Sequence, residues 1–473
     1  MICCTILGVA LFAIFRQNYR LDNVPENNED FISKLPDEIL VSILSRTSTK
    51  DSIRSCVLSK RWRDLYKFVP SVTLRCTDLV KRGGDHDAHS SYLVTNRLRN
   101  YLLLRSGSRI RSFSFRCCEP RSSDRFVSCV HSLARLGVEE LVLHFSLPFR
   151  FSCHLLFEMQ SLKYFHLKWC YLIRNWKSQK YCNSLQTLEL TSVTVLYYGA
   201  LDCIFSNCLS LESLKIEECT FYDKLWISGS LKSLQIKACK GVKEIEMGAP
   251  NLVRFEFIDS KLRKLIFKHV PQLQTIYLRV LYEFLRIYPI RRTLAKDLPQ
   301  LKSLSVYTEG DFFQGKEIYA FRNLRRLDFS LCYRSRIDLL SMIPFLQNCP
   351  LLQEFHMDAN SVGYSGEQVR KDRAVVLHKE LQRVEITGFE GTENEMEFAS
   401  YIVKSAVALE KMHIFRCGKR YIGLNTWDYR DERSQWKQKK YEMIHKQLKE
   451  EAISSKAQIV VQSALLHENN LWS

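Results

Sequence analysis

From Ile110 onward, one arrangement of apolar positions returns along the chain: an apolar residue, two variable residues, a second apolar residue, one variable residue and a third apolar residue. Alternation across the second and third apolar positions is typical of a short β-strand with one buried face. Successive copies begin 20 to 29 residues apart. The thirteen copies begin at Ile110, Val138, Leu162, Leu185, Leu211, Leu231, Leu252, Leu273, Leu301, Leu324, Leu352, Leu381 and Leu409.

That period is expected of leucine-rich repeats. No single unit can bury its apolar strand face alone, so neighbouring units must stack into a solenoid. The sequence therefore predicts an α/β fold in which a horseshoe of strands lines a concave surface. The variable strand positions on this surface are the predicted target-binding residues, namely Lys215, Glu217, Gln235, Lys237, Arg254 and Glu256.

The units differ in the segment that comes after each strand. Two additional apolar triplets, Val242/Ile245/Met247 and Leu262/Leu265/Phe267, predict extended outer segments with little or no helix. The longer unit 324–350 has room for a helix. Helical spacing at 92–104 and 393–408 predicts caps for the two ends of the solenoid, which must be closed. A basic helix beginning near Arg433 and a final strand at 457–461 are expected to complete the chain.

The segment Ile32–Tyr66 has a different pattern, which predicts three short helices. Leu35, Ile39, Leu40, Ile43 and Leu44 share one helical face. Thr49 and Asp51 are the expected caps of the second helix, and Ser59 caps a third that carries Trp62. About 35 residues are too few to close a core alone, so the exposed apolar surface predicts a partner. The alternative interpretation is a helical corner of a larger domain.

Specific residues favour the first interpretation. The run from Leu35-Pro36-Asp37-Glu38-Ile39-Leu40 to Val57-Leu58-Ser59-Lys60-Arg61-Trp62-Arg63 resembles the F-box, in the form common in plants. Arg46-Thr47-Ser48 departs from the family, which often has a Leu-Pro step there. The resemblance implies binding to a Skp-family adaptor of a cullin–RING ubiquitin ligase. The implied contact residues are Leu35, Pro36, Ile39, Leu40, Val57, Leu58, Ser59, Lys60 and Trp62.

A second resemblance lies near the other end. The stretch from Leu381-Gln-Arg-Val-Glu-Ile to Ala408-Leu-Glu-Lys-Met-His-Ile resembles the FBD domain, which closes many plant F-box/leucine-rich-repeat proteins. The predicted organisation is an apolar extension at 1–28, the F-box at 29–75, a linker and N-terminal cap at 76–108, leucine-rich repeats at 109–364, FBD-like terminal repeats at 365–417 and a basic helix and strand at 418–473.

Composition narrows the choice of partner. The 473 residues carry a net charge of +18, which could attract nucleic acid or anionic membrane. Acidic and basic residues are interspersed, and no zinc-finger, RNA-recognition or basic-zipper signature occurs, so nucleic acid is not favoured. The uncharged residues 1–15 are short for a membrane span. A non-structural extension is favoured there over a membrane anchor, and secretion is the least favoured interpretation.

The reactive residues do not predict an enzyme. Of the 17 cysteines none forms a C-x-x-C pair, and six stand at the turn that leaves a repeat strand, where small buried residues are expected: Cys118, Cys170, Cys219, Cys239, Cys332 and Cys417. Asp85-His86-Asp87 with His89 is the best metal-like cluster, and a polar loop is the favoured interpretation. No nucleophile elbow, phosphate loop or His-Glu-x-x-His occurs. We therefore expect no catalytic residue, no metal and no cofactor.

Together with the repeats, the F-box resemblance implies a substrate-recognition adaptor of a Skp–cullin–F-box ubiquitin ligase, which serves ubiquitin-dependent protein degradation in the cytoplasm or nucleus. Its F-box binds the Skp-family subunit and its repeats bind an unknown target protein. The alternative is a repeat-based protein-binding scaffold that has no link to ubiquitin and is tethered to a membrane by residues 2–15.

Overall fold

The computed structural model describes residues 32, 34–79, 88–105, 107–117, 123–173, 181–196, 199–258, 264–280, 292–308, 319–331, 338–359, 375–423, 426–430 and 436–462. The extension at 1–28 and the cluster Asp85-His86-Asp87 lie outside these ranges. The chain divides between Thr220 and Phe221 into an N-terminal and a C-terminal unit.

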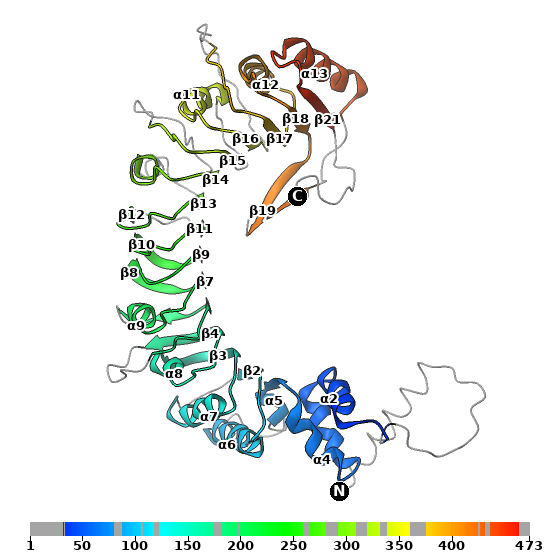
Figure 1. Cartoon of the computed structure of the whole chain (residues 1–473), viewed down its shortest axis with the longest axis vertical. Helices are drawn as coiled ribbons and strands as arrows, with labels where there is room; N and C mark the ends of the chain where they lie inside the picture. The colour runs from blue at the N-terminus through cyan, green and yellow to red at the C-terminus, as the bar shows by residue number, and fades with distance from the viewer. Residues whose placement is uncertain are drawn as a thin grey trace, which may run out of the picture. The chain divides into compact units, whose positions relative to one another are not determined.

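The N-terminal unit begins with the predicted short helices (Figure 1): α2 (Asp37–Ser45), α3 (Thr49–Arg54), η1 (Ser55–Val57), α4 (Trp62–Leu65) and η2 (Tyr66–Phe68). Pro36 precedes α2, and Asp37 and Glu38 occupy its first turn, where negative charge is favourable. The cap of α3 differs from the prediction. Ser48 supplies it, because its hydroxyl accepts the Asp51 N–H at 3.1 Å, and Thr49 is already helical.

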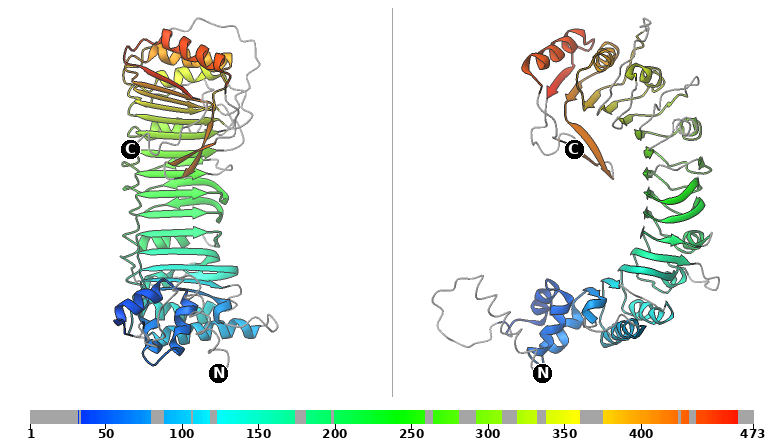
Figure 2. Two further views of the ribbon diagram at one scale, coloured as in Figure 1. Left: turned by 90° about the vertical axis from the view of Figure 1, so that its right-hand side faces the viewer. Right: turned by 180° about the vertical axis from the view of Figure 1, so that it is seen from behind.

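Parallel strands come after the short helices. They are β1 (Ser71–Arg75), β2 (Ser112–Cys117), β3 (Glu140–Ser152), β4 (Tyr164–Ile173), β5 (Thr187–Thr191) and β7 (Ser213–Glu217), with the short outer strand β6 (Thr194–Val195). Helices α5 (Cys76–Leu79), α6 (Ala88–Leu104), α7 (Ser123–Arg135), α8 (His154–Phe157) and α9 (Ala200–Asn207) connect them. Helices α6 to α9 lie on one side of the strands (Figure 2).

The C-terminal unit continues the same architecture. Its parallel strands are β9 (Ser233–Lys237), β11 (Arg254–Ile258), β13 (Thr275–Val280), β14 (Ser303–Thr308), β15 (Arg326–Leu331), β16 (Glu354–Asp358), β17 (Arg383–Thr387), β18 (Lys411–Phe415) and β21 (Gln458–Gln462). The helical elements are η3 (Leu339–Met342), α11 (Ile343–Gln347), α12 (Glu393–Ser405) and α13 (Gln438–Glu451). The antiparallel hairpin of β19 (Gly418–Gly423) and β20 (Thr426–Arg430) lies on the opposite side of the sheet from α11, α12 and α13 (Figures 1 and 2).

The apolar repeat positions form the core of both units. Phe113, Leu141, Phe165, Leu188 and Leu214 pair in register across the N-terminal strands and are almost fully buried. The equivalent residues pair in the same way across the C-terminal strands, from Leu234 and Phe255 to Met412 and Ile459. All thirteen predicted copies therefore form strands, and the predicted fold class of an F-box followed by an open α/β repeat sheet is confirmed.

Strand β1 was not predicted, although it repeats the same pattern. Val69, Val72 and Leu74 have the repeat spacing and are buried, and Val72 pairs with Phe113 of β2. The repeat sheet therefore begins directly after the F-box helices, within the range 29–75 that the sequence assigned to the F-box. The other domain boundaries stay predictions.

The doubled apolar rhythm produces outer strands, as predicted. Residues of β10 (Lys240–Met247) and β12 (Lys264–Phe267) pair in parallel and bury Ile245 and Leu265, next to β8 (Thr220–Ile227). Gly241 has φ +82°, and a Cβ atom at this position would lie 2.0 Å from the Phe221 carbonyl oxygen. This close approach of two outer strands requires glycine.

The C-terminal end is closed by α12, α13 and β21, in line with the predicted helices and strand. Thr392 and Glu395 form a capping box at the start of α12. The α12 residues Phe398, Ile402 and Val403 are fully buried, as are Ile444 and Leu448 of α13. These helices cover apolar surface at the end of the repeats, which is the role that a terminal cap of a solenoid must serve.

Candidate partner-binding surfaces

The F-box helices enclose a small apolar core. Leu40, Leu44, Trp62, Leu65 and Val69 form one buried cluster, against which Leu35 and Val41 pack. The expectation that these helices cannot bury one another is therefore wrong in part. Short as they are, they close a core because a residue from each of α2, α4 and the segment before β1 reaches the same point.

Around that core, six large apolar side chains stay exposed: Ile32, Ile39, Ile43, Val57, Leu58 and Phe68. Ile39 and Ile43 of α2 have 47% and 40% of their surface exposed, and Val57 and Leu58 each have 53%. Such a concentration on one small element is typical of an interaction surface. We call Ile39, Ile43, Val57 and Leu58 the F-box apolar patch.

The structure divides the predicted adaptor contacts into two groups. Pro36, Ile39, Val57, Leu58, Ser59 and Lys60 are exposed, and Leu35 is half-buried. Leu40 and Trp62, in contrast, are 0% and 6% exposed inside the core, so they cannot serve as surface contacts in this conformation. Their position corrects the prediction, because the hydrophobic face of α2 is wider than the part that the F-box itself can cover.

Arg61 joins the two sequence motifs that carry the F-box resemblance. Its side chain donates to Asp37 Oδ1 from Nε at 2.7 Å and to the Leu35 carbonyl from NH2 at 2.6 Å. Ser59 Oγ accepts the Trp62 N–H at 3.3 Å, although the residue that precedes α4 is Arg61, which provides no side-chain cap. The Leu-Pro step and the Ser-Lys-Arg-Trp segment are therefore held side by side.

A buried arginine that sequence reasoning missed ties the F-box to the first repeat. Arg105 is 1% exposed and lies directly after α6. Its guanidinium donates to the carbonyl oxygens of Tyr66 and Val69 at 3.2 and 2.5 Å and to the Tyr101 hydroxyl at 3.1 Å. Hydrogen bonds from a charged donor are among the stronger ones in proteins, so this contact fixes the end of η2 against α6.

The second surface is the face of each sheet that lies opposite the helices, here called the helix-free face. In the N-terminal unit it carries Lys215 and Glu217, both half-buried. Lys215 donates to Glu189 Oε1 at 2.8 Å, and the Tyr164 hydroxyl donates to Glu189 Oε2 at 2.9 Å. Burial alone would raise the pKa of Glu189, but these two hydrogen bonds outweigh it and lower the pKa.

The other four predicted target contacts lie in the C-terminal unit. Gln235 and Arg254 are half-buried and Lys237 is exposed. Glu256 is only 2% exposed and accepts a hydrogen bond from Gln235 Nε2 at 2.8 Å. Glu256 is therefore a less accessible contact than the sequence suggested, because the central position of these strands is covered.

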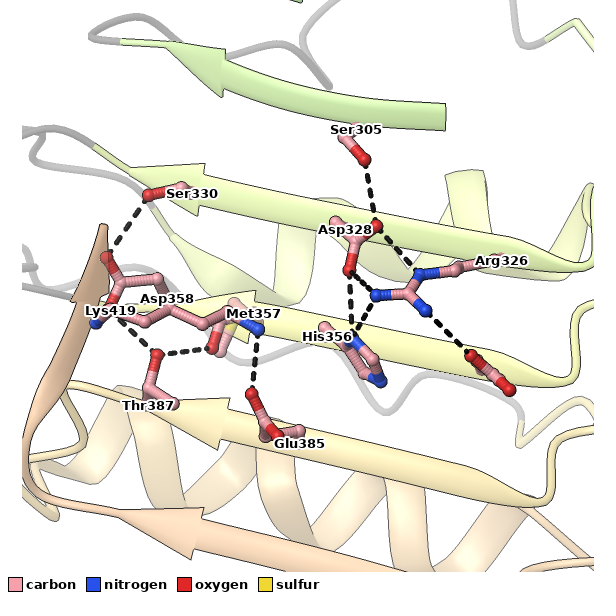
Figure 3. A network of polar contacts seen from close by, with 11 residues as sticks. Ser305, Arg326, Asp328, Ser330, His356, Met357, Asp358, Glu385, Thr387 and Lys419 are labelled. Carbon is pink, nitrogen blue, oxygen red and sulfur yellow. Dashed lines mark hydrogen bonds and ion pairs between the residues drawn. The ribbon is translucent and has the colours of Figure 1, made fainter. Parts of the chain in front are cut away.

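Further along this unit the central strand positions form a buried polar network (Figure 3). Asp328 of β15 lies at its centre with a side chain that is 0% exposed. It accepts hydrogen bonds from Ser305 Oγ at 2.8 Å, from His356 Nδ1 at 2.8 Å and from Arg326 Nε at 3.0 Å. The charge of this carboxylate is thus compensated by donors from its own strand and from the two adjacent strands, β14 and β16.

Lys419 enters the same network from the hairpin (Figure 3). Its Nζ donates to Glu385 Oε1 at 2.7 Å, and the two side chains are only 3% and 4% exposed. The Lys419 ammonium also lies 4.8 Å from the centre of the Trp427 ring of β20. Asp358 accepts hydrogen bonds from Thr387 Oγ1 at 2.9 Å and from Ser330 Oγ at 3.1 Å.

The carboxyl groups of this network differ in their pKa values. Burial would raise the pKa of Asp328 and of Glu385, but bonds and charges from His356, Arg326 and Lys419 outweigh it and hold both pKa values below the usual range. Burial dominates at Asp358 and raises its pKa, despite the hydrogen bond from Thr387 and the charge of Lys419. Opposed shifts in adjacent carboxyl groups arise from their different numbers of charged partners.

The network has the features of a binding or stabilising element. It holds no cysteine nucleophile, and no three His, Cys, Asp or Glu side chains within the described ranges gather so that they could hold a metal ion. Cys219, Cys239 and Cys417 are buried just after their strands, as predicted. Cys170 is also buried but lies within β4, which continues to Ile173, and Cys118 and Cys332 lie outside the described residues. Lys419 and Trp427 had no signal in the repeat pattern, because the hairpin falls outside its period.

Comparison with protein families assigns both parts of the chain. The family model of the At1g61320/AtMIF1 leucine-rich-repeat domain matches residues 102–463. The F-box domain model matches residues 32–65. These two matches cover the repeat strands from β2 onward and the F-box helices from α2 to α4.

Curated relatives come from Arabidopsis thaliana. The FBD-associated F-box protein At1g61320 is 24% identical over 80% of this chain and 87% of its own length. The FBD-associated F-box protein At5g60610 is 26% identical over 81% of this chain and 99% of its own length. Among solved structures, an internalin from Listeria monocytogenes covers 81% of this chain and 92% of its own, with 11% identity and a TM-score of 0.32, which is too weak to add to the assignment.

Proposed function

Because this chain belongs to the plant F-box/leucine-rich-repeat proteins of the FBD-associated type, we propose that it is a substrate-recognition adaptor of a Skp–cullin–F-box ubiquitin ligase. In this role it is a non-catalytic subunit, which holds a target protein near the ubiquitin-transferring subunits. Proximity of this kind raises the effective concentration of the reacting groups.

The observation that carries the proposal is the F-box apolar patch. Ile39, Ile43, Val57 and Leu58 surround a core that is already closed, so their exposure does not come from incomplete folding. Pro36, Ser59 and Lys60 are also exposed, and Leu35 is half-buried, so these residues are available as further contacts. Leu40 and Trp62 act as supports beneath this contact surface.

Target binding is assigned to the repeats. The contacts proposed on the helix-free face are Lys215 and Glu217 of the N-terminal unit and Gln235, Lys237, Arg254 and Glu256 of the C-terminal unit. No cofactor is needed for recognition of this kind. A location in the cytoplasm or nucleus is consistent with binding to a Skp-family adaptor. None of the helices in the described ranges has the length and apolar character that a bilayer span requires.

A pull-down with a plant Skp-family adaptor tests the proposal. In the double variant Val57→Asp/Leu58→Asp two exposed apolar contacts become charged, and we expect adaptor affinity to fall about 30-fold or more, because central interface residues contribute ~2 kcal/mol or more. The matched control Met443→Asp/Ile453→Asp changes two side chains of similar exposure, 51% and 52%, in the C-terminal unit, and should bind like wild type. Equal binding by all three proteins would reject the adaptor role and favour a scaffold unconnected with ubiquitin.

A further inference from the structure

Two cysteines occupy equivalent positions in consecutive repeats of the N-terminal unit. Cys182 lies three residues before Leu185, the first apolar residue of its copy, and Cys208 lies three residues before Leu211. Equivalent positions of stacked parallel repeats are separated by the strand spacing of about 4.7–4.9 Å. A disulfide needs Cα atoms about 4.4–6.8 Å apart, and the stacking of equivalent repeat positions favours a separation of this size.

Hydrogen bonds hold the two cysteines in this stacked arrangement. The Cys182 N–H donates to the Asn207 carbonyl at 2.8 Å, directly beside Cys208. The two sulfurs interact closely enough for each to shift the pKa of the other. The Cys182 thiol donates to the Met159 carbonyl oxygen at 3.6 Å, and its sulfur lies 3.8 Å from Ser184 Oγ.

The same contacts make the two sulfurs chemically different. Interaction with Cys208, helped by Ser184, lowers the pKa of Cys182 to about 6 even though burial opposes this. The same interaction and burial raise the pKa of Cys208. Thiolate is the reactive form of cysteine, so Cys182 is assigned as the nucleophile of the pair. Cys208 is then the resolving cysteine.

The pair is buried but lies directly beneath the surface. Cys182 and Cys208 are 0% and 1% exposed, whereas the adjacent residues Tyr181 and Leu209 are 54% and 57% exposed. Cys208 is the C-cap residue of α9, and helix ends open more easily than helix centres. A small oxidant can therefore reach the sulfurs through local opening.

We propose that Cys182 and Cys208 are a redox modification site, which hydrogen peroxide converts to a disulfide. The Cys182 thiolate attacks one peroxide oxygen, the O–O bond breaks, and the departing hydroxide takes up a proton to become water. The Cys208 sulfur then attacks the resulting sulfenic acid, so the S–S bond forms while the hydroxyl leaves with the Cys208 proton as a second water. Two thiols are oxidised and one peroxide is reduced, and a small thiol such as glutathione reverses the change.

The disulfide joins the ends of two consecutive repeats. It ties the segment before β5 to the end of α9, and it closes a loop that constrains the unfolded chain. We therefore expect the oxidised N-terminal unit to unfold at a higher temperature than the reduced unit. This site is independent of the adaptor function, because no residue of the F-box apolar patch takes part.

Cys349 provides a matched control within the chain. It stands three residues before Leu352, at the same repeat position, but Phe321 and His378 occupy that position in the adjacent repeats. Cys349 is 1% exposed, and burial raises its pKa. Cys349 therefore occupies the same repeat position as Cys182 and Cys208, but neither adjacent repeat places a cysteine beside it. We expect it to resist oxidation.

The test is peptide mapping by mass spectrometry of the reduced full chain after peroxide treatment and thiol blocking. We expect one linked peptide pair, Cys182 with Cys208, which dithiothreitol separates, together with unmodified Cys349. Cys349→Ser should keep this link and Cys208→Ser should lose it. If Cys208→Ser fails to fold, Cys208→Ala replaces it. The wild-type chain should show a raised melting temperature after oxidation, and the Cys208 variant should not.

Recovery of Cys182 and Cys208 as separate, unlinked peptides under conditions that oxidise the half-exposed Cys56 would overturn the proposal. A link from Cys182 to Cys153 or Cys203 in place of Cys208 would do the same.

Discussion

The F-box exposes apolar side chains, whereas the helix-free face of the C-terminal unit buries charged ones. The F-box closes its core and leaves Ile39, Ile43, Val57 and Leu58 exposed, whereas the C-terminal sheet buries the charged Asp328, Glu385 and Lys419. Exposed apolar area gains free energy when a partner covers it, but buried charges are costly unless their own chain pairs them. The F-box apolar patch is therefore suited to a partner, whereas the buried charges around Asp328 and Glu385 are already paired within the chain.

Removal of the buried lysine should have the largest effect on stability. Lys419→Met leaves Glu385 buried without its cation, and loss of one partner of such a pair costs about 3–5 kcal/mol. Urea denaturation of the full chain measures the loss, and hydrogen exchange should place it in β17 and the hairpin. Lys404→Met is the control, because Lys404 is 48% exposed in its pair with Glu451 and its loss should cost less than about 1 kcal/mol. Equal effects in the two variants would show that the network contributes no more than a surface ion pair.

A pair of substitutions also distinguishes the core of the F-box from the F-box apolar patch by their effects on stability. Leu40→Ala removes a fully buried side chain and should destabilise the F-box by about 2–5 kcal/mol through lost packing and the cavity left behind. Leu58→Ala, at a side chain that is 53% exposed, should change stability by less than about 0.5 kcal/mol. Hydrogen exchange of the α2 amides measures both effects. Similar protection in the two variants would contradict the division into support and contact residues.

A change of pH should have a smaller effect on the stability of the N-terminal unit. Burial and the charge of Lys168 lower the pKa of His166 to about 4, against the partial opposing effect of Glu189. The unfolded chain therefore binds a proton that the folded chain rejects, and stability falls as the pH drops from about 6.5 toward 4. Between pH 7 and pH 5 the loss from this residue is about 2 kcal/mol.

Urea denaturation at several pH values measures that dependence. His166→Gln should flatten it relative to wild type, leaving the contributions of His144 and His154, whose pKa values burial also lowers. A wild-type slope unchanged in the variant would show that His166 accepts its proton without loss of packing.

Local patterns predicted the repeats well and the F-box surface only in part. Each strand copy is set by three nearby apolar residues, so all thirteen could be located, and the same spacing at Val69, Val72 and Leu74 would have located β1. The cap of α3 was misplaced by one residue, because Ser48, Thr49 and Asp51 are all suitable caps in sequence. Helical spacing also could not separate Leu40 from Ile39, since both belong to the broad apolar face of α2.

By itself the sequence determined the F-box motif, the repeat period, the strand register and the closing helix α12, because each depends on residues within a few positions of one another. Only the tertiary structure decided that Arg105 holds the F-box against α6, that Lys419 pairs with Glu385 and that Cys182 stacks on Cys208. These contacts join residues 26 to 39 positions apart, and their existence depends on how the units stack, which no local pattern encodes.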